Sequence, residues 1–208
     1  MDSKHTDRTT AGTDPVEAAR DDVLRKIGRN VVNFQKMEAM LKALNAQQSV
    51  SGSLRELQTL ATRAKRAVAK QPMGPLVDAF VKHAFSGAPE ASGGAVQEEA
   101  EVSFSFRIES NEVIAKERKR ALRAVVAERN KLVHQWLAEL DPGSRDSCLR
   151  LSAELDEQHA RVMPEFEALK GIFNAFRELR AEMSRHIDSD EFLNAISGDR
   201  ASESEVNR

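Results

Sequence analysis

The segment ALRAVVAERNKLVHQWLAEL, residues 121–140, carries the clearest structural signal in the sequence. At about 100° per residue, its large apolar side chains fall on one stripe of an amphipathic helix. The same periodicity extends back to residue 111, so we expect a single long helix over 111–140 that packs this stripe against other helices. The stripe consists of Leu122, Val125, Val126, Leu132, Val133, Trp136 and Leu140.

Helical patterns dominate most of the remaining chain as well. Good helix formers are abundant, while the 208 residues include no Tyr, one Trp, 10 Gly and 6 Pro. Asp14 followed by Pro15 is typical of a helix start, and Pro164 should kink the last long helix or split it in two. Helices are expected over 16–46, 53–70, 76–85, 111–140 and 147–187, with a short one within 188–197. The fold class predicted is all-α, an antiparallel helical bundle.

The length of the chain favours one domain with tails, since domains of about 150 residues are common. Residues 1–15 are polar and show no periodicity, which predicts a disordered tail. The single helical domain should span 16–188, and 189–208 should hold a short helix and a C-terminal tail.

The segment EVSFSFRIE, residues 101–109, alternates apolar with polar side chains, which is the pattern of a half-buried strand. A single strand leaves its backbone hydrogen bonds unpaired and needs a partner. The favoured partner is the AVQ segment at 95–97, and the alternative is the same strand of a second subunit. We therefore expect a small strand or hairpin insertion near 95–109, while 49–53 is expected to be a loop.

Charge and composition exclude several classes of function. The formal net charge of -2 indicates no overall affinity for nucleic acids or membranes, so any basic surface must be local. No run of apolar residues is long enough for a membrane span. The single cysteine, Cys148, excludes an intrachain disulfide and fits a reducing cytosol. His83, His159 and His186 lie on separate segments without the spacing of metal ligands. We expect a cytoplasmic protein without a metal or cofactor.

Arg129 interrupts the apolar stripe, because its helical position lies at the centre of the stripe. A cation that loses water at such a position needs an opposite charge or several hydrogen bonds in exchange. One interpretation is a structural ion pair with an acidic residue of a neighbouring helix, for which Glu154, Asp156 and Glu157 are candidates. The other is that Arg129 binds a ligand.

A second stripe on the same helix favours a ligand. The predicted helical face beside the apolar stripe combines four cationic residues with an amide and an imidazole. Such a ribbon is a reasonable footprint for phosphate groups presented to a histidine, the side chain that exchanges protons near neutral pH. The alternative is an ordinary solvated face, with salt bridges to Glu112 and Glu117. The residues of this face are Lys116, Arg120, Arg123, Asn130, Lys131 and His134.

Arg129, Asn130 and His134 resemble the R-polar-xxx-H motif of HEPN domains, helical bundles that occur in prokaryotic toxins, anti-phage systems and RNA-processing enzymes. The resemblance implies a metal-independent endoribonuclease whose composite site forms between two copies of the chain. It also implies that Arg129 binds the scissile phosphate, Asn130 orients the site, and His134 transfers a proton as the RNA 2′-hydroxyl attacks. The cations expected to bind RNA are Lys116, Arg120, Arg123 and Lys131.

The sequence departs from one branch of this family. Toxins silenced by nucleotide transfer carry a tyrosine two residues after the histidine, where this chain has Trp136, so this mode of regulation is in doubt. The expected function is a toxin or anti-phage ribonuclease, with RNA, a second copy, and an antitoxin or regulatory protein as partners. The alternative is a non-catalytic helical regulator that binds RNA or protein.

Overall fold

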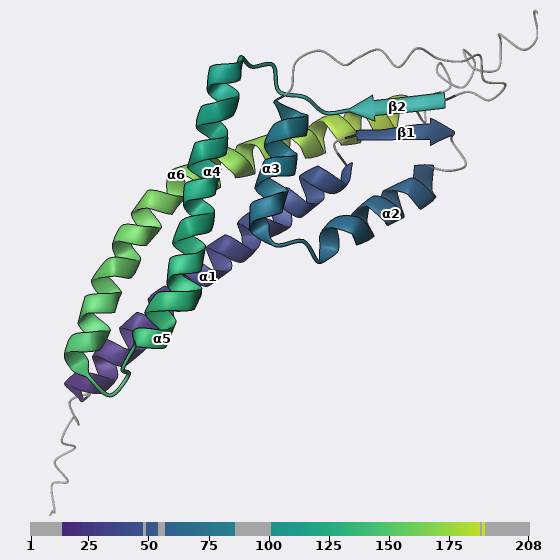
Figure 1. Ribbon diagram of the computed structural model, residues 1–208. Coiled ribbons are helices and arrows are strands. Elements are labelled where there is room, and N and C mark those ends of the chain that lie inside the picture. The colour runs from purple at the N-terminus through teal and green to yellow at the C-terminus, as the bar shows by residue number, and fades with distance from the viewer. Residues whose placement is uncertain (1–13, 48, 54–56, 86–100, 188, 190–208) are drawn as a thin grey trace, which may run out of the picture. The chain divides into compact units, whose positions relative to one another are not determined.

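The computed structural model describes residues 14–47, 49–53, 57–85, 101–187 and 189 (Figure 1). Helices predominate in this part of the chain, which confirms the all-α class. Most of the two predicted terminal regions lies outside the described residues. The elements are α1 (Pro15–Gln47), β1 (Ser49–Ser53), α2 (Leu57–Ala69), α3 (Met73–Ala84), β2 (Glu101–Ser105), α4 (Glu112–Lys131), the π-helical turn η1 (Leu132–Trp136), α5 (Leu137–Glu139) and α6 (Arg145–Ile187).

The contacts of the chain group into two compact units. Unit 1 contains Met1–Lys36 and Arg120–Glu165, and unit 2 contains Met37–Lys119 and Phe166–Arg208. The helices α1, α4 and α6 each contribute one part to unit 1 and another to unit 2. The single helical domain expected for 16–188 stays a prediction, because the grouping of contacts is not a test of independent folding.

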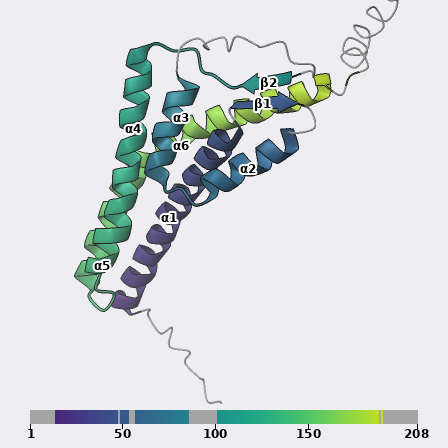
Figure 2. The same ribbon diagram turned by 45° about the vertical axis from the view of Figure 1, so that its right-hand side comes forward.

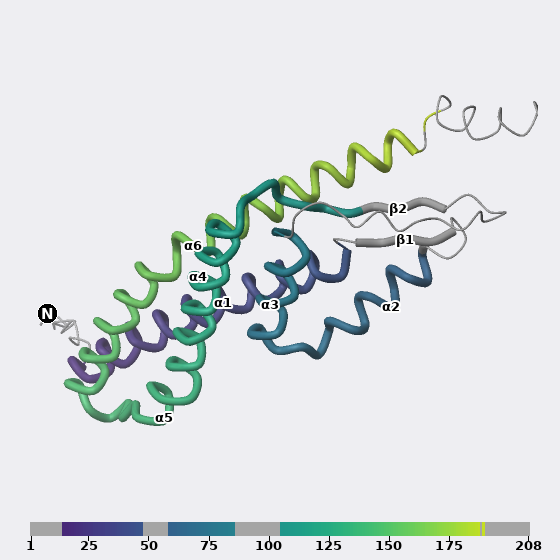
Figure 3. The backbone as a smooth tube through the Cα atoms, turned by 45° about the horizontal axis from the view of Figure 1, so that its top comes forward, coloured from purple at the N-terminus to yellow at the C-terminus, as the bar shows by residue number. Residues whose placement is uncertain are grey.

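Unit 1 is a bundle of three helical segments, and α1 begins it where the sequence indicated. The Asp14 carboxylate accepts a hydrogen bond of 3.0 Å from the N–H of Val16, as a helix cap does. In Figures 1 and 2 the second half of α4 lies beside the first half of α6, and Figure 3 shows the backbone turning back at α5. These two segments are antiparallel, as predicted for neighbours joined by a short turn.

The first and last segments of unit 1 run parallel to each other, and both run antiparallel to the α4 segment, as in an up-and-down bundle of three helices. Ser152 of α6 donates to Asp22 of α1, and His159 lies 3.4 Å from the amide nitrogen of Asn33. Residue numbers therefore rise together along both helices. The reason is connectivity: α1 and α6 are not consecutive, so no short turn forces them to be antiparallel.

The core of unit 1 is apolar along facing helical stripes. Cys148 is fully buried within it, in keeping with the behaviour of a small apolar residue. Four polar residues, Asn30, Ser147, Ser152 and Gln158, are also buried there, and three of them join helices. The buried apolar residues are Ala19, Val23, Phe34, Leu122, Val125, Leu132, Cys148, Leu151, Leu155 and Val162.

The helix predicted over 111–140 contains a wider turn that the sequence did not indicate. In η1 the N–H of Leu137 bonds to the carbonyl of Leu132, five residues back rather than four. The extra residue in this turn shifts the phase of everything after it. Val133, predicted in the buried stripe, lies within this turn and is 36% exposed, and Leu137, directly after it, is 38% exposed.

Unit 2 has its own core around α3 and the second half of α1. Asn45 holds the two helices together, since its side-chain amide donates to the carbonyls of Leu41 at 2.8 Å and Leu76 at 2.9 Å. Phe106 and Phe176 pack edge to face with ring centroids 5.1 Å apart. Buried apolar residues of this unit include Met37, Leu41, Leu44, Leu76, Val77, Phe80 and Phe176.

The predicted strand exists as β2, and its partner among the described residues is a segment that the sequence did not indicate. The segment β2 pairs antiparallel with β1, and Ser49 lies opposite Ser105 in the register. The loop predicted for 49–53, SVSGS, is therefore wrong, because this segment forms a strand by pairing with β2. Since Ser53 belongs to β1, the helix that follows begins only at Leu57. The 95–97 segment lies outside the described residues.

Prolines limit the helices less than the sequence suggested. Pro164 was predicted to kink the last helix or to split it, and the split is wrong because α6 continues through Pro164. Proline has no N–H, so the carbonyl of Ala160, four residues earlier, has no helical hydrogen-bond donor. Pro164 and Ala160 are both exposed, so water can bind to this carbonyl instead. Similarly, α3 begins at Met73 rather than at Leu76, because a proline such as Pro75 fits the first turn of a helix.

Candidate functional site

Arg129 lies near the end of α4, half-buried, and has no carboxylate partner among the described residues. Its guanidinium donates one hydrogen bond of 3.1 Å to the side-chain oxygen of the adjacent Asn130. No ion pair joins it to an acidic side chain in the part of the chain that the structure describes. The interpretation of Arg129 as half of a structural ion pair is therefore wrong within these residues.

Two of the three acidic residues considered as partners of Arg129, Asp156 and Glu157, are engaged elsewhere. Asp156 binds two cations of α1, with Lys26 at 2.6 Å and Arg29 at 3.0 Å. These contacts lower the pKa of Asp156, with the hydrogen bond from Lys26 as the largest cause. Glu157 lies 3.6 Å from Arg161 on its own helix. The sequence thus identified surface carboxylates correctly but assigned them the wrong cation.

Gln158 links all three helices of unit 1 through its fully buried side chain. Its carbonyl oxygen accepts a hydrogen bond of 3.1 Å from Asn30 on α1. Its amide nitrogen donates to Glu128 on α4, to the backbone carbonyl at 2.9 Å and to the carboxylate at 3.1 Å. The backbone immediately before Arg129 is therefore held in place by a buried amide.

Glu128 is neutralised by its own partner on α6 and does not serve Arg129. Its carboxylate accepts a hydrogen bond of 2.8 Å from Arg161. Burial would raise the pKa of Glu128, but the hydrogen bonds from Arg161 and Gln158 outweigh it and lower that pKa below its ordinary value. Adjacent residues of α4 thus differ, since the Glu128 carboxylate has a charged partner and the Arg129 guanidinium has none among the described residues.

The positions of Asn30 and Gln158 were missed in the sequence, although a signal for them existed. Gln158 follows the buried Leu151 and Leu155 at helical spacing, so it lies on the apolar stripe of α6. Asn30 lies in the same way between the buried Val23 and Phe34. The phase argument that selected Arg129 would have selected both of these amides.

His134 and Asn130 both lie exposed at the end of the long helix. His134 belongs to η1, and its imidazole has no hydrogen bond or ion pair with a described residue. Residues four apart on a helix share a face, which places His134 near the face of Asn130. π-Helical turns inside α-helices occur frequently at functional sites.

The four cations predicted to bind RNA all lie on α4. Arg120, Arg123 and Lys131 are exposed and belong to unit 1, whereas Lys116 belongs to unit 2. The ammonium of Lys116 pairs with Glu112 at 2.7 Å, which agrees with the alternative of a salt-bridged helix face. Lys131 lies over the Trp136 ring, 4.6 Å from its centroid, in a cation–π contact.

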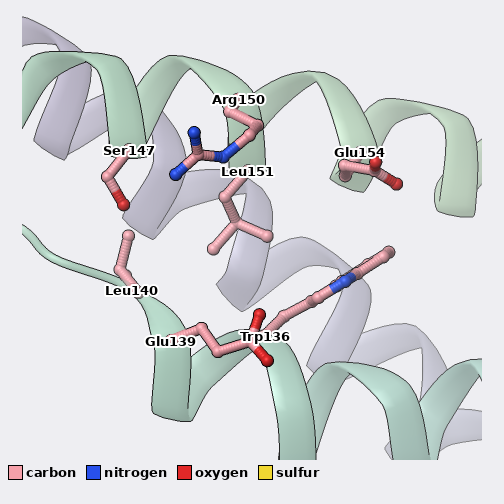
Figure 4. A pocket seen from close by; sticks show the side chains of 7 residues that line it. All are labelled: Trp136, Glu139, Leu140, Ser147, Arg150, Leu151 and Glu154. Atoms are coloured by element: carbon pink, nitrogen blue, oxygen red, sulfur yellow. The ribbon is translucent and has the colours of Figure 1, made fainter.

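A half-open cleft of about 190 Å³ lies between the end of the long helix and α6 (Figure 4). This cleft could not be inferred from the sequence, because it forms where two helices meet across a turn. Ser147 is buried at one end, where its hydroxyl accepts a hydrogen bond of 3.2 Å from the N–H of Asp141. The lining residues are Trp136, Glu139, Leu140, Ser147, Arg150, Leu151 and Glu154.

No protein-family model, no curated protein and no solved structure matches the chain. Within the described ranges, no helix is both long enough and apolar enough to cross a membrane. The same ranges contain no group of three or more His, Cys, Asp or Glu side chains placed to hold a metal ion. The residues around Arg129 and the cleft are therefore the basis for inferring a function.

Proposed function

We propose that this protein is a HEPN-like endoribonuclease in which Arg129, Asn130 and His134 form each chain's part of a dimeric composite site. The observation that carries the proposal is the unpaired guanidinium of Arg129. It is half-buried, and its sole hydrogen bond to a described residue is to the amide next to it.

Phosphate is the ligand that suits such a group best. A guanidinium presents several N–H donors in one plane and binds the oxygens of a phosphate through paired, charge-assisted hydrogen bonds. Arg129 uses one donor on Asn130, which fixes the orientation of the guanidinium and leaves its other donors available. Asn130 is therefore a positioning residue for Arg129.

The reaction proposed is transesterification of RNA. The 2′-hydroxyl oxygen forms a bond to the adjacent phosphorus while the bond from phosphorus to the 5′ oxygen breaks. The products are a 2′,3′-cyclic phosphate and a 5′-hydroxyl end. His134 transfers the proton at one of these oxygens, and Arg129 stabilises the negative charge that develops on the phosphoryl oxygens.

The proposal includes a second copy of the chain. Proton removal and proton donation require two groups, and each chain contributes one histidine to the motif. Val133 and Leu137, the apolar side chains beside His134 in sequence, are more than a third exposed, and a second copy would cover them. In the cell, such an enzyme would serve as a toxin or in phage defence, restrained by an antitoxin or regulatory protein.

The first test is cleavage of single-stranded RNA by purified protein in EDTA. We expect cleavage by the wild type and a loss of about 10²- to 10⁴-fold for His134→Ala, the contribution typical of a proton-transfer group. His83→Ala is the matched control, because His83 is also exposed and lies in unit 2 on α3. Circular dichroism should report the same helicity for all three proteins.

Two results would contradict the proposal. Equal cleavage by the wild type and His134→Ala would exclude the histidine from the reaction. A strictly monomeric protein in light scattering at micromolar concentration would exclude a composite site. Salt-sensitive RNA binding without cleavage would select the non-catalytic RNA-binding alternative.

A further inference from the structure

The cleft beside η1 contains three charged side chains that the proposed reaction does not use. Arg150, Glu139 and Glu154 line it, and none of them forms a hydrogen bond or salt bridge with a described residue. In Figure 4 the guanidinium of Arg150 lies on the α6 side, and Glu139 and the Trp136 indole come from the opposite wall. One guanidinium, two carboxylates and an aromatic ring thus line the same cleft.

The volume of the cleft indicates the size of a ligand. Pockets for drug-sized molecules measure roughly 300–1,000 Å³, and this cleft measures about 190 Å³. It therefore suits a single planar ring system rather than a whole nucleotide. Lys131 lies over one face of the Trp136 ring, and the other face offers such a ligand a surface for stacking, the common way in which proteins hold unpaired bases.

The charges of the cleft select among the bases. Guanine alone presents N1–H and N2–H donors on its Watson–Crick edge together with the O6 and N7 acceptors on its Hoogsteen edge. A carboxylate such as that of Glu139 or Glu154 would accept hydrogen bonds from the Watson–Crick edge. The Arg150 guanidinium would donate to the Hoogsteen edge. A phosphate group would be repelled by the two glutamates, and a cationic side chain by Arg150.

We infer that this cleft binds a guanine base. The inference rests on the proposed function for the source of the base, which is an RNA strand, and thereby names the sequence preference of the enzyme. Trp136 and His134 are two residues apart, and residues at this spacing do not share a helix face. The guanine would therefore lie at a fixed offset from the cleaved bond rather than at the reacting nucleotide.

Trp136 provides a direct readout, because it is the single tryptophan of the chain. Titration of the intact protein with GMP should change its fluorescence, whereas AMP, CMP and UMP should bind at least about tenfold more weakly, the discrimination of one good bidentate contact. A single-stranded oligoribonucleotide with one guanine should bind more tightly than GMP if RNA is the natural source. Tighter binding of GMP would assign the site to a free nucleotide and overturn the RNA source.

Substitutions in the cleft test which groups recognise the base. Arg150→Gln and the double substitution Glu139→Gln with Glu154→Gln should each reduce the preference for GMP about tenfold. Arg145→Gln and Glu178→Gln are matched controls, since both residues are exposed and neither lines the cleft. Glu139 and Arg150 are exposed and Glu154 is half-buried, so the helices should remain, which circular dichroism checks.

The outcomes separate this inference from the nuclease proposal. Selective binding of GMP without cleavage of any RNA would retain the guanine site and reject the nuclease. Cleavage of RNA at positions unrelated to guanine, together with equal fluorescence responses to all four nucleotides, would retain the nuclease and overturn the guanine site. A response to free arginine that exceeds the response to GMP would also overturn it.

Discussion

The sequence contains the dipeptide Arg-Asn twice in unit 1, and the two copies have different surroundings. Arg29 and Asn30 lie on α1, and Arg129 and Asn130 lie near the end of α4. The local contact is the same in both, since each guanidinium donates to the adjacent amide oxygen, at 3.0 Å in α1 and 3.1 Å in α4. The differences therefore arise from what the rest of the unit provides.

The copy on α1 is fully satisfied by α6. Arg29 binds the Asp156 carboxylate at 3.0 Å and the Leu155 carbonyl at 3.1 Å. Asn30 is buried and donates to the same carbonyl and to Gln158. An arginine that finds these partners inside its own fold serves stability, and nothing remains for a ligand to bind.

The copy on α4 lacks these partners, and the residue that follows it also differs. Four residues after Asn30 stands Phe34, which is buried in the core, whereas four residues after Asn130 stands the exposed His134. An Arg-Asn pair is thus ambiguous in sequence. Its environment decides whether it is structural or available for chemistry.

Between the two copies, the largest difference should come from substituting the two arginines in parallel. Arg129→Ala should reduce RNA cleavage about 10²- to 10³-fold, as expected when a donor to the developing charge is lost, and change the unfolding free energy little. Arg29→Ala should do the opposite, with cleavage retained and stability reduced by about 1–2 kcal/mol. Cleavage rates and urea unfolding measured on both variants test this.

A particular pattern of results would break the comparison. If Arg129→Ala destabilised the protein as much as Arg29→Ala and left cleavage unchanged, the α4 copy would also be structural. Lysine at position 129 sharpens the test, because it keeps the charge but loses the planar fork, so cleavage should recover only in part.

The next largest effect concerns Gln158, which bonds to Asn30 in one copy and to Glu128, the residue before the other copy. Gln158→Leu should lower the unfolding free energy by about 2–3 kcal/mol, because it removes the buried partners of Asn30 and Glu128 and leaves their polar atoms unsatisfied. Gln35→Leu is the control, since Gln35 is exposed on α1. Urea unfolding followed by circular dichroism measures both.

Equal stability of these two variants would show that the buried amide is dispensable. The sharper outcome is a loss of RNA cleavage by Gln158→Leu that exceeds its loss of folded protein. Such a result would show that Gln158, through the Glu128 backbone, positions Arg129 as well as stabilising the core.

Much of the helical fold could be predicted because helical periodicity is a local property. The Asp14 cap and the buried positions of Leu122, Val125 and Leu132 followed from spacing alone. The π-helical turn did not, because it depends on how side chains on both sides of the turn pack against other helices. The strand β1 was missed for a related reason, since Ser49–Ser53 gains its structure from pairing with β2 rather than from its own residues.

The residues of the candidate site could be predicted from the sequence, but the contacts that surround them could not. The irregular position of Arg129 in an apolar pattern was visible in sequence, as was the spacing to His134. Whether a carboxylate reached Arg129 depended on contacts between helices far apart in the chain, such as those of Asp156 with α1. The cleft at Trp136 likewise depends on a turn that brings two helices together.

The smallest predicted effect concerns the stability at low pH of the contacts between α1 and α6. The pKa of Asp22 falls from 3.8 to about 2, chiefly through the hydrogen bond from Ser152, with Lys26 and Arg25 adding to it against burial. Because the folded pKa is lowered, this carboxylate stabilises the fold above about pH 4, and its contribution is lost as the pH falls towards 2. Solvent screens a carboxylate that is 37% exposed, so the loss should stay below about 1 kcal/mol.

Asp22→Asn should therefore be less stable than wild type at pH 6, and the difference should shrink at pH 2.5 in urea unfolding. A difference that stayed constant across this range would mean that Asp22 acts through packing, and that the paired charges on α1 and α6 contribute less to stability than their geometry indicates.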